Sequence, residues 1–207
     1  MSITIDRAVF LDFDGVLFDT IREVYAVSMI ALDNSTNIKD INFESKHFEK
    51  FSKLRYLVGP AWNYYYVMQA INKESFDSSR DLEIEYKSLL DQTLLGEYDP
   101  FEKKFFLARQ NLREKEHKYW LSMICTYNIV KDLRSILSQF KEQFFLVTTR
   151  DKDSVLDLLS LNNLDIPESN IFTKKEYALN NSKANIIQDL IKKYKVEESL
   201  FIDDLEE

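Results

Sequence analysis

Short apolar runs with the length of buried strands recur at four places in the chain. They are Ala8–Leu11, Phe144–Val147, Ile171–Phe172 and Leu200–Ile202. A few consecutive apolar residues are typical of a strand that is covered on both faces of a parallel sheet. The stretches 151–162 and 182–194, which separate the last three runs, instead carry apolar residues at helical spacing. The C-terminal part of the chain therefore predicts alternating strands and helices.

The long segment between the first two runs has a different pattern. It contains no convincing strand, and its apolar residues recur at intervals of three, four or seven, for example at Phe101, Phe105 and Leu112. We predict an α/β protein with a Rossmann-like parallel-sheet core, formed by residues 1–20 and 136–207 and interrupted by an all-helical insert at residues 21–135. Because the insert leaves the core just after the first strand, its position is that of a lid.

Two aspartates directly follow the first apolar run. Asp12 and Asp14 are separated by one residue, and Gly15 comes next. Residues two apart on a strand point to the same side at roughly 6 to 7 Å of rise, so two ionised carboxylates there repel each other unless a cation lies between them. The carboxyl ends of strands are also where open α/β sheets bind ligands. We therefore expect a divalent metal ion here, and we expect Asp19 to cap the first helix.

The later strands and the last helix also present polar residues at their ends. These are Thr148, Thr149 and Arg150 after the second run, Lys183 at the start of the last helix, and Asp203 and Asp204 after the fourth run. Together with the first pair of aspartates they supply a hydroxyl donor, a cation and further carboxylates. Phosphoryl transfer to an aspartate requires these groups.

Each of these later residues also has an ordinary structural interpretation. Arg150 alone reads equally well as a solvent-facing base, and Lys183 as an exposed helix residue. Asp203 and Asp204 read as an acidic tail, although the apolar run immediately before them favours a strand end. The functional interpretation requires that these residues lie together at one edge of the sheet, whereas the structural interpretations do not.

Charge and composition exclude several classes of function. The net charge of −8 argues against a surface for nucleic acid or anionic membranes, although a small anionic substrate needs only local positive charge. The first residues lack the basic start and apolar core of a signal peptide, and no apolar run approaches the ~20 residues of a membrane span. We therefore expect a cytoplasmic protein without nucleic-acid or membrane partners.

The chain cannot form a cysteine-based metal site. The single cysteine, Cys125, excludes an intrachain disulfide, and its apolar surroundings predict a core position. His47 and His117 lie in charged helical stretches of the insert, where surface positions are expected. The aspartates therefore remain the predicted metal ligands.

The order of these motifs resembles that of the haloacid dehalogenase superfamily. The family's four motifs correspond to Phe10–Val16, Phe145–Thr148, Lys183 and Phe201–Asp204. The first motif is highly specific, whereas the others are persuasive as an ordered set, and Lys174 and Lys175 compete with Lys183 for the third. The resemblance covers residues 2–20 and 141–207. It departs from the family at the end, because only three residues follow Asp204 where a helix is usual.

The insert resembles the family's helical C1-type cap, as found in the subfamily of phosphoglycolate phosphatase and β-phosphoglucomutase. The segment Arg55–Pro60 looks like the cap's substrate loop in phosphoglycolate-phosphatase-like members. The resemblance implies that Arg55 and Gly59, together with Thr149 and Arg150 of the core, contact the substrate.

The resemblance also implies a division of labour in the core. Asp12 would be the nucleophile that forms an aspartyl-phosphate, and Asp14 the general acid and base. Thr148 would hydrogen-bond the phosphoryl oxygens, and Lys183 would neutralise charge on the phosphoryl group and on Asp12. Mg²⁺ would be held by Asp12, the backbone carbonyl of Asp14, Asp204 and, directly or through water, Asp203.

The leading interpretation is a Mg²⁺-dependent phosphatase that hydrolyses a small phosphomonoester, such as a sugar, polyol or amino-alcohol phosphate. A phosphomutase with the same residues is the nearest alternative. A receiver-type phospho-acceptor domain uses similar residues, but its acidic pair ends the first strand without a long insert. A binding protein with an inactive site is the remaining alternative, and every catalytic position is filled. The sequence leaves open whether the protein is a monomer or a homodimer.

Overall fold

The computed structural model describes residues 4–73, 78–92 and 99–204 and divides into two compact units. The first, here called the core unit, comprises the chain up to Asp19 together with Cys125–Asp204. The second, here called the helical unit, comprises Thr20–Ile124. Residues 125–135, which the sequence pattern assigned to the insert, belong to the core unit. The helical spacing of this stretch could not distinguish a helix of the insert from one that packs on the sheet.

The core unit contains a four-stranded parallel sheet, which confirms the predicted α/β fold class. Its strands are β1 (Arg7–Leu11), β4 (Phe144–Val147), β5 (Ile171–Phe172) and β6 (Glu198–Ile202), in the order β5-β4-β1-β6. In the register, Phe10 lies beside Phe145 on β4 and beside Phe201 on β6. The chain builds outward from β1 to β4 and β5 and then returns to the other side of β1. The carboxyl ends of β1, β4 and β6 consequently lie together at one edge.

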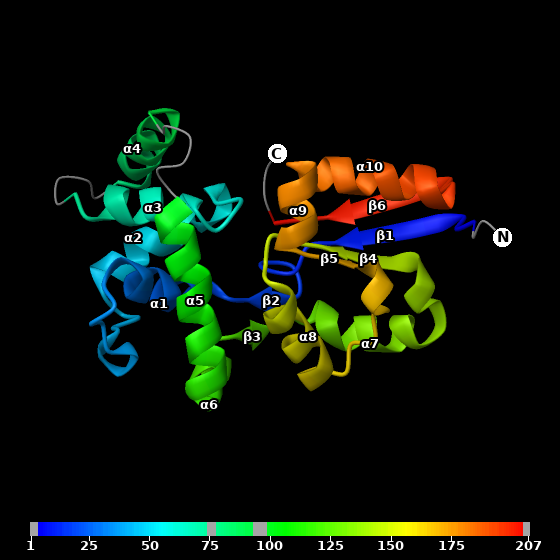
Figure 1. The fold of residues 1–207 in the computed structure, drawn as a ribbon, viewed down its shortest axis with the longest axis horizontal. Coiled ribbons are helices and arrows are strands. Elements are labelled where there is room, and N and C mark those ends of the chain that lie inside the picture. The colour runs from blue at the N-terminus through cyan, green and yellow to red at the C-terminus, as the bar shows by residue number, and fades with distance from the viewer. Residues whose placement is uncertain (1–3, 74–77, 93–98, 205–207) are drawn as a thin grey trace. The chain divides into compact units, whose positions relative to one another are not determined.

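Helices cover both faces of this sheet (Figure 1). On one face lie α7 (Ile129–Phe140) and α8 (Lys152–Leu161), and on the other lie α9 (Lys174–Asn180) and α10 (Lys183–Tyr194). Single turns of 3-10 helix precede β4 at Lys141–Gln143 and β5 at Glu168–Asn170. The predicted helices at 151–162 and 182–194 correspond to α8 and α10 with their capping residues. The α9 helix was not predicted, because its sequence is mostly polar.

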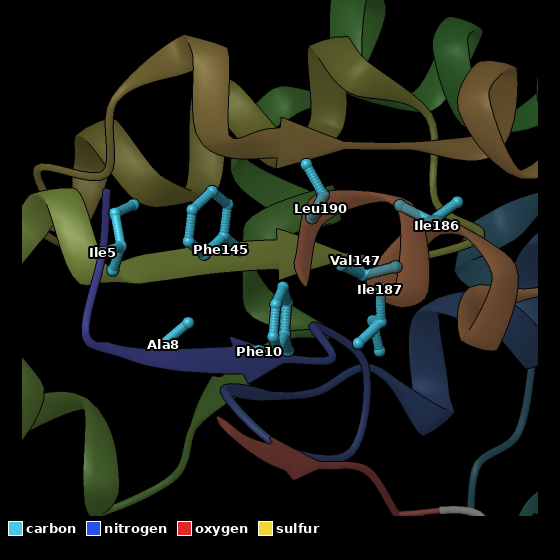
Figure 2. Packing of buried hydrophobic residues seen from close by; sticks show 8 residues of the cluster. All are labelled: Ile5, Ala8, Phe10, Phe145, Val147, Ile186, Ile187 and Leu190. Atoms are coloured by element: carbon cyan, nitrogen blue, oxygen red, sulfur yellow. The ribbon is translucent and has the colours of Figure 1, made fainter. Parts of the chain in front are cut away.

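A cluster of apolar side chains fixes α10 on the sheet (Figure 2). Phe10 of β1 and Phe145 of β4 stack with ring centroids 5.3 Å apart and are fully buried. Ile186, Ile187 and Leu190 project from α10 onto these strands. Burying a side chain of this size contributes about 1.5 to 3 kcal/mol, so the cluster holds the start of α10 firmly against the end of the sheet.

A two-stranded antiparallel ribbon lies where the chain passes between the units. It consists of β2 (Phe18–Asp19) and β3 (Cys125–Thr126), and Asp19 pairs with Cys125. Two sequence-based expectations are wrong here. Asp19 is part of a strand, and Thr20 precedes the first helix without a side-chain cap. Cys125 is exposed, as is Thr126, the other residue of this short strand.

The helical unit is built from six helices among its described residues. They are α1 (Ile21–Leu32), α2 (Lys46–Leu54), α3 (Asn63–Ile71), α4 (Ser79–Asp91), α5 (Asp99–Lys115) and α6 (His117–Ser122). Short 3-10 turns occur at Ile38–Asp40 and Arg55–Leu57. None of the helices in the described residues combines the length and the apolar character needed to cross a membrane.

A buried ion pair joins α1 to α5 inside the helical unit. Arg109 donates from Nε to Glu23 Oε1 at 2.7 Å and from Nη2 to Glu23 Oε2 at 3.1 Å. The indole of Trp120 on α6 donates to the same Glu23 Oε1 at 3.2 Å. The guanidinium also lies over the ring of Phe105, 4.8 Å from its centroid. One carboxylate therefore connects three helices in the apolar interior of this unit.

Candidate active site

The chemically useful side chains of the core unit follow the carboxyl ends of its strands. Asp12 comes directly after β1, and its backbone N–H donates to Ile202 O of β6 at 2.9 Å. Thr148 comes directly after β4, and its N–H donates to Phe172 O of β5 at 2.9 Å. These bonds extend the sheet ladder by one residue, so the first side chain beyond each strand has a fixed position. Asp203 and Asp204 follow β6 in the same way.

Lys183 reaches this edge from the first residue of α10. Ser182 caps the helix by accepting a hydrogen bond from the Asn185 N–H at 3.0 Å, which fixes where the helix begins. The Lys183 ammonium lies 3.0 Å from Asp12 Oδ2 and 2.8 Å from Asp203 Oδ2. The structure thus brings Lys183 to the aspartates. Lys174 and Lys175, the competing lysines, instead form the start of α9.

Asp12, Asp203 and Lys183 form a buried cluster with an excess of negative charge. Asp12 is only 4% exposed, and its pKa is raised to about 7. Burial is the main cause; Lys183 lowers the pKa, and the charges of Asp203 and Asp14 contribute to the rise. Burial alone would lower the pKa of Lys183, but the carboxylates of Asp12 and Asp203 outweigh it and shift the pKa upward. One ammonium therefore does not fully compensate the carboxylates, and the cluster favours a further cation.

Three carboxylates at this edge have the arrangement of a metal site. Asp12, Asp203 and Asp204 each offer an oxygen, and these oxygens lie within 4.8 Å of one another. Asp12 Oδ1 is buried and has no hydrogen-bond partner among the described residues. A buried carboxylate oxygen without a partner is costly unless a cation binds it. Hard oxygen donors of this kind suit Mg²⁺, so the donor set fits the ion that the sequence predicted.

Gly15 allows the loop after β1 to approach Asp204 closely. Its φ of +88° lies in the left-handed region, and a Cβ atom at this position would collide with the Asp204 carboxylate. The Gly15 N–H donates to Phe18 O at 2.8 Å, and the rings of Phe13 and Phe18 stack with centroids 4.6 Å apart. This compact turn holds the backbone of Asp14 next to the acidic cluster. The sequence indicated the turn but not the contact with Asp204.

Asp14 is held by a buried arginine. Arg150 Nη1 donates to Asp14 Oδ1 at 2.8 Å, and the Arg150 side chain is fully buried. The interpretation of Arg150 as a solvent-facing base is therefore wrong. The pair joins the loop after β1 to the loop after β4, and the guanidinium also lies over the ring of Phe13 at 5.7 Å from its centroid. Because the two residues are 136 positions apart, no sequence pattern signalled this contact.

The two threonines after β4 differ in their surroundings. Thr148 is 1% exposed, and its Oγ1 accepts the Arg150 N–H at 3.2 Å. A hydroxyl that accepts one hydrogen bond keeps its own proton to donate, so Thr148 can still bind an oxyanion. Thr149 is half-buried in the same loop. Whether either residue contacts a substrate stays a prediction.

The predicted substrate residues of the insert lie in the helical unit, between α2 and α3. Arg55 begins a 3-10 turn and is half-buried. The Gly59 N–H donates to Asn63 Oδ1 at 3.2 Å. A Cβ atom on Gly59 would meet that oxygen at an ordinary 3.6 Å, so glycine is not required there by space. The role of Arg55 and Gly59 in substrate binding also stays a prediction.

The sequence matches no protein-family model and no curated protein. Solved structures, in contrast, share its fold. A hydrolase from Pseudomonas syringae aligns over 96% of this chain and 76% of its own, with 16% identity and a TM-score of 0.53. A predicted phosphatase from Clostridium acetobutylicum aligns over the same shares, with 16% identity and a TM-score of 0.54.

A third solved structure has a lower similarity. It is a HAD-superfamily hydrolase of subfamily IA from Geobacter sulfurreducens PCA, which aligns over 98% of this chain and 78% of its own with 13% identity and a TM-score of 0.46. At these identities the similarity concerns the fold. The first two structures share their fold with this chain, in line with the α/β fold class predicted from the sequence.

Proposed function

We propose that this protein is a Mg²⁺-dependent phosphatase that hydrolyses a small phosphomonoester through an aspartyl-phosphate on Asp12. The observation that carries the proposal is the cluster at the sheet edge, in which Lys183 lies between Asp12 and Asp203 and Asp12 Oδ1 has no partner among the described residues. The two solved structures that share the fold support it, since one is a hydrolase and the other a predicted phosphatase.

Asp12, Asp203 and Asp204 would hold the metal ion, together with the backbone carbonyl of Asp14. The chemistry that Mg²⁺ supplies when bound is charge neutralisation on the phosphoryl oxygens and on Asp12. An ion at this place also removes the electrostatic conflict of the cluster. A divalent cation beside Asp12 favours the ionised carboxylate, which is the form that acts as a nucleophile.

In the first step, an Asp12 carboxylate oxygen attacks phosphorus and the ester P–O bond breaks. Asp14 donates its proton to the departing alkoxide, so the alcohol leaves neutral. Lys183 and the Thr148 hydroxyl stabilise the negative charge on the transferred group. The product of this step is a phosphorylated Asp12 and an ionised Asp14.

In the second step, Asp14 takes a proton from a water molecule, which attacks phosphorus and releases inorganic phosphate. Asp12 and the protonated Asp14 are thereby regenerated. Arg150 acts in both steps as a positioning residue, because its hydrogen bond fixes one oxygen of the Asp14 carboxylate. Proton transfer depends steeply on such placement.

The substrate is a small phosphorylated metabolite in the cytoplasm, such as a sugar, polyol or amino-alcohol phosphate. The net charge of −8 disfavours nucleic acid and anionic membranes. A phosphomutase would use the same residues but would return the phosphoryl group to another hydroxyl of its substrate. ³¹P NMR of a hexose monophosphate incubated with the protein separates the two, because a phosphatase yields inorganic phosphate and a mutase yields a positional isomer.

The direct test measures phosphate release from p-nitrophenyl phosphate with Mg²⁺ and with excess EDTA. We expect activity only with Mg²⁺, and we expect Asp12→Asn to lower kcat at least about a thousandfold because the amide is not a nucleophile. Asp189→Asn makes the same chemical change at an exposed position of α10 and should retain activity. Activity that survives in Asp12→Asn would show that another residue attacks phosphorus.

A further inference from the structure

A cavity lies wholly within the helical unit. It has a volume of about 610 Å³ and is bounded by α1, the loop 33–45, the start of α2 and the end of α3. A volume of this size is in the range of small-molecule sites. The side chains of Tyr25, Met29 and Leu32 line it from α1, at positions i, i+4 and i+7 of one helix face. No residue of the phosphatase site takes part in it.

Three of the lining residues form a chain of hydrogen bonds. The Tyr25 hydroxyl oxygen lies 2.8 Å from His47 Nδ1. On the other side of the ring, His47 Nε2 lies 2.9 Å from Asn72 Oδ1. Because the Asn72 oxygen can only accept, Nε2 donates to it, and Nδ1 accepts the tyrosine proton in the neutral ring. His47 is thus half-buried and fixed, in contrast to the surface position expected from its sequence context. Burial raises the pKa of Tyr25, so its hydroxyl stays protonated.

The floor of the cavity rests on closely packed aromatic rings. Tyr25 is 3% exposed, and its ring meets the rings of Phe48 and Phe51 edge-on, with centroids 5.1 Å apart in each pair. The half-buried Met29 and Ile41 and the exposed Leu32 supply the accessible aliphatic surface of the lining, and Met68 of α3 is fully buried behind it. A ligand with an apolar body would therefore meet a preformed surface and would not have to order it.

The rim is acidic. Asp33 and Asp40 line the cavity, whereas no lysine or arginine does so among the described residues. Hydrogen bonds from the Ser35 hydroxyl and N–H lower the pKa of Asp33, so this carboxylate is ionised at neutral pH. Negative charge at the mouth of an apolar cavity favours a cation and opposes an anion such as a phosphate ester.

We propose that this cavity binds an organic ammonium ion, whose apolar body lies against Met29 and Ile41 and whose charge lies at the rim with Asp33 and Asp40. The site shares no residue with the phosphatase site. It selects an amine carried on an aryl or alkyl chain, because the lining offers accessible aliphatic side chains inside and carboxylates only at the mouth. The proposal does not depend on the phosphatase function.

Three probes with one body and different charges test the proposal by isothermal titration calorimetry. They are 4-phenylbutylamine, 4-phenylbutyrate and 4-phenylbutanol. We expect the amine to bind at least about tenfold more tightly than the carboxylate, with the alcohol between them. Asp40→Asn should weaken binding of the amine about three- to fivefold, and Glu44→Gln, an exposed residue of the same loop that does not line the cavity, should leave it within about twofold.

Met29→Lys places a tethered ammonium on the lining face of α1 and should abolish binding of the amine, with circular dichroism as the check that the helices are retained. Asp12→Asn should bind the amine as the unaltered protein does, which separates this site from the catalytic one. Equal binding of all three probes, the absence of binding by the amine, or binding that persists in Met29→Lys would each overturn the proposal.

Discussion

Asp12 lies where burial and like charge both oppose its ionised form. Its pKa in the fold is raised to about 7, whereas a free aspartate titrates near about 3.9. Between these two pH values the folded protein binds more protons than the unfolded chain. The free energy of unfolding of the metal-free protein therefore decreases as pH rises from about 4 to about 7, by up to about 1.4 kcal/mol per pH unit.

Asp12→Asn removes this titration and gives the first prediction. In EDTA, the variant should become more stable than the unaltered protein as pH rises, with the difference near zero at pH 4 and largest above pH 7. Urea unfolding at a series of pH values measures it. Asp189→Asn, on the surface of α10, should follow the pH dependence of the unaltered protein. Parallel curves for Asp12→Asn and the unaltered protein would contradict a raised pKa at Asp12.

The sequence predicted those site residues that stand next to strong local signals. Asp12 and Asp14 follow an apolar strand and precede a glycine, and Asp203 and Asp204 follow another strand. The structure places all four at the edge of the sheet as expected. No local sequence pattern indicates the contact between Arg150 and Asp14, because it depends on how the loops after β1 and β4 are placed next to each other. A sequence pattern reports neighbours along one element and says little about which loops meet.

Among the elements, the helices α1, α5 and α6 depend on one buried charge. Glu23 accepts hydrogen bonds from Arg109 and Trp120 and is fully buried. Glu23→Gln should therefore lower the free energy of unfolding by about 3 to 5 kcal/mol, because it removes the negative charge to which the buried guanidinium donates two hydrogen bonds. Replacing both partners, as in Glu23→Leu with Arg109→Met, should recover most of the loss.

Circular dichroism during urea unfolding measures these changes. The matched control is Glu49→Gln, which breaks the exposed pair of Glu49 and Lys53 on α2. The two charged atoms of that pair also lie 2.7 Å apart, but its loss should lower the free energy of unfolding far less, because water screens exposed charges. If Glu23→Gln and Glu49→Gln lowered the free energy of unfolding by similar amounts, the buried ion pair of Glu23 would contribute no more to stability than the exposed pair of Glu49.

The sequence predicted correctly those elements whose residues are buried along their whole length. It did not predict elements that depend on strand pairing, or on which unit a helix packs against. Phe144–Val147 is apolar throughout, and the strand has these bounds in the structure. The two-residue strands β2 and β3 have no periodicity to detect, so Asp19 read as a helix cap and Cys125 as a core residue. The boundary expected at residue 135 failed for a related reason, because α7 has a helical pattern whichever unit it packs in.

At the scale of the whole molecule, the chain has two separate interiors. Strands β1 and β4 and helix α10 enclose the apolar cluster of the core unit, whereas the pair of Glu23 and Arg109 lies in the helical unit. The proposed metal ligands all belong to the core unit. A ligand stabilises the cooperative unit that binds it, by an amount that grows with its concentration relative to Kd. Each unit can therefore be perturbed by a change that leaves the other interior intact.

Hydrogen exchange followed by mass spectrometry across a urea series distinguishes the two units. We expect peptides from β1 and β4 to unfold at a urea concentration that rises with Mg²⁺, while peptides from α1 and α5 keep their midpoint. Glu23→Gln should do the reverse, lowering the midpoint of α1 and α5 and leaving that of β1 and β4. If both sets of peptides moved together under either change, the protein would unfold as one cooperative body, because coupling between the two interiors would then exceed the stability that either perturbation alters.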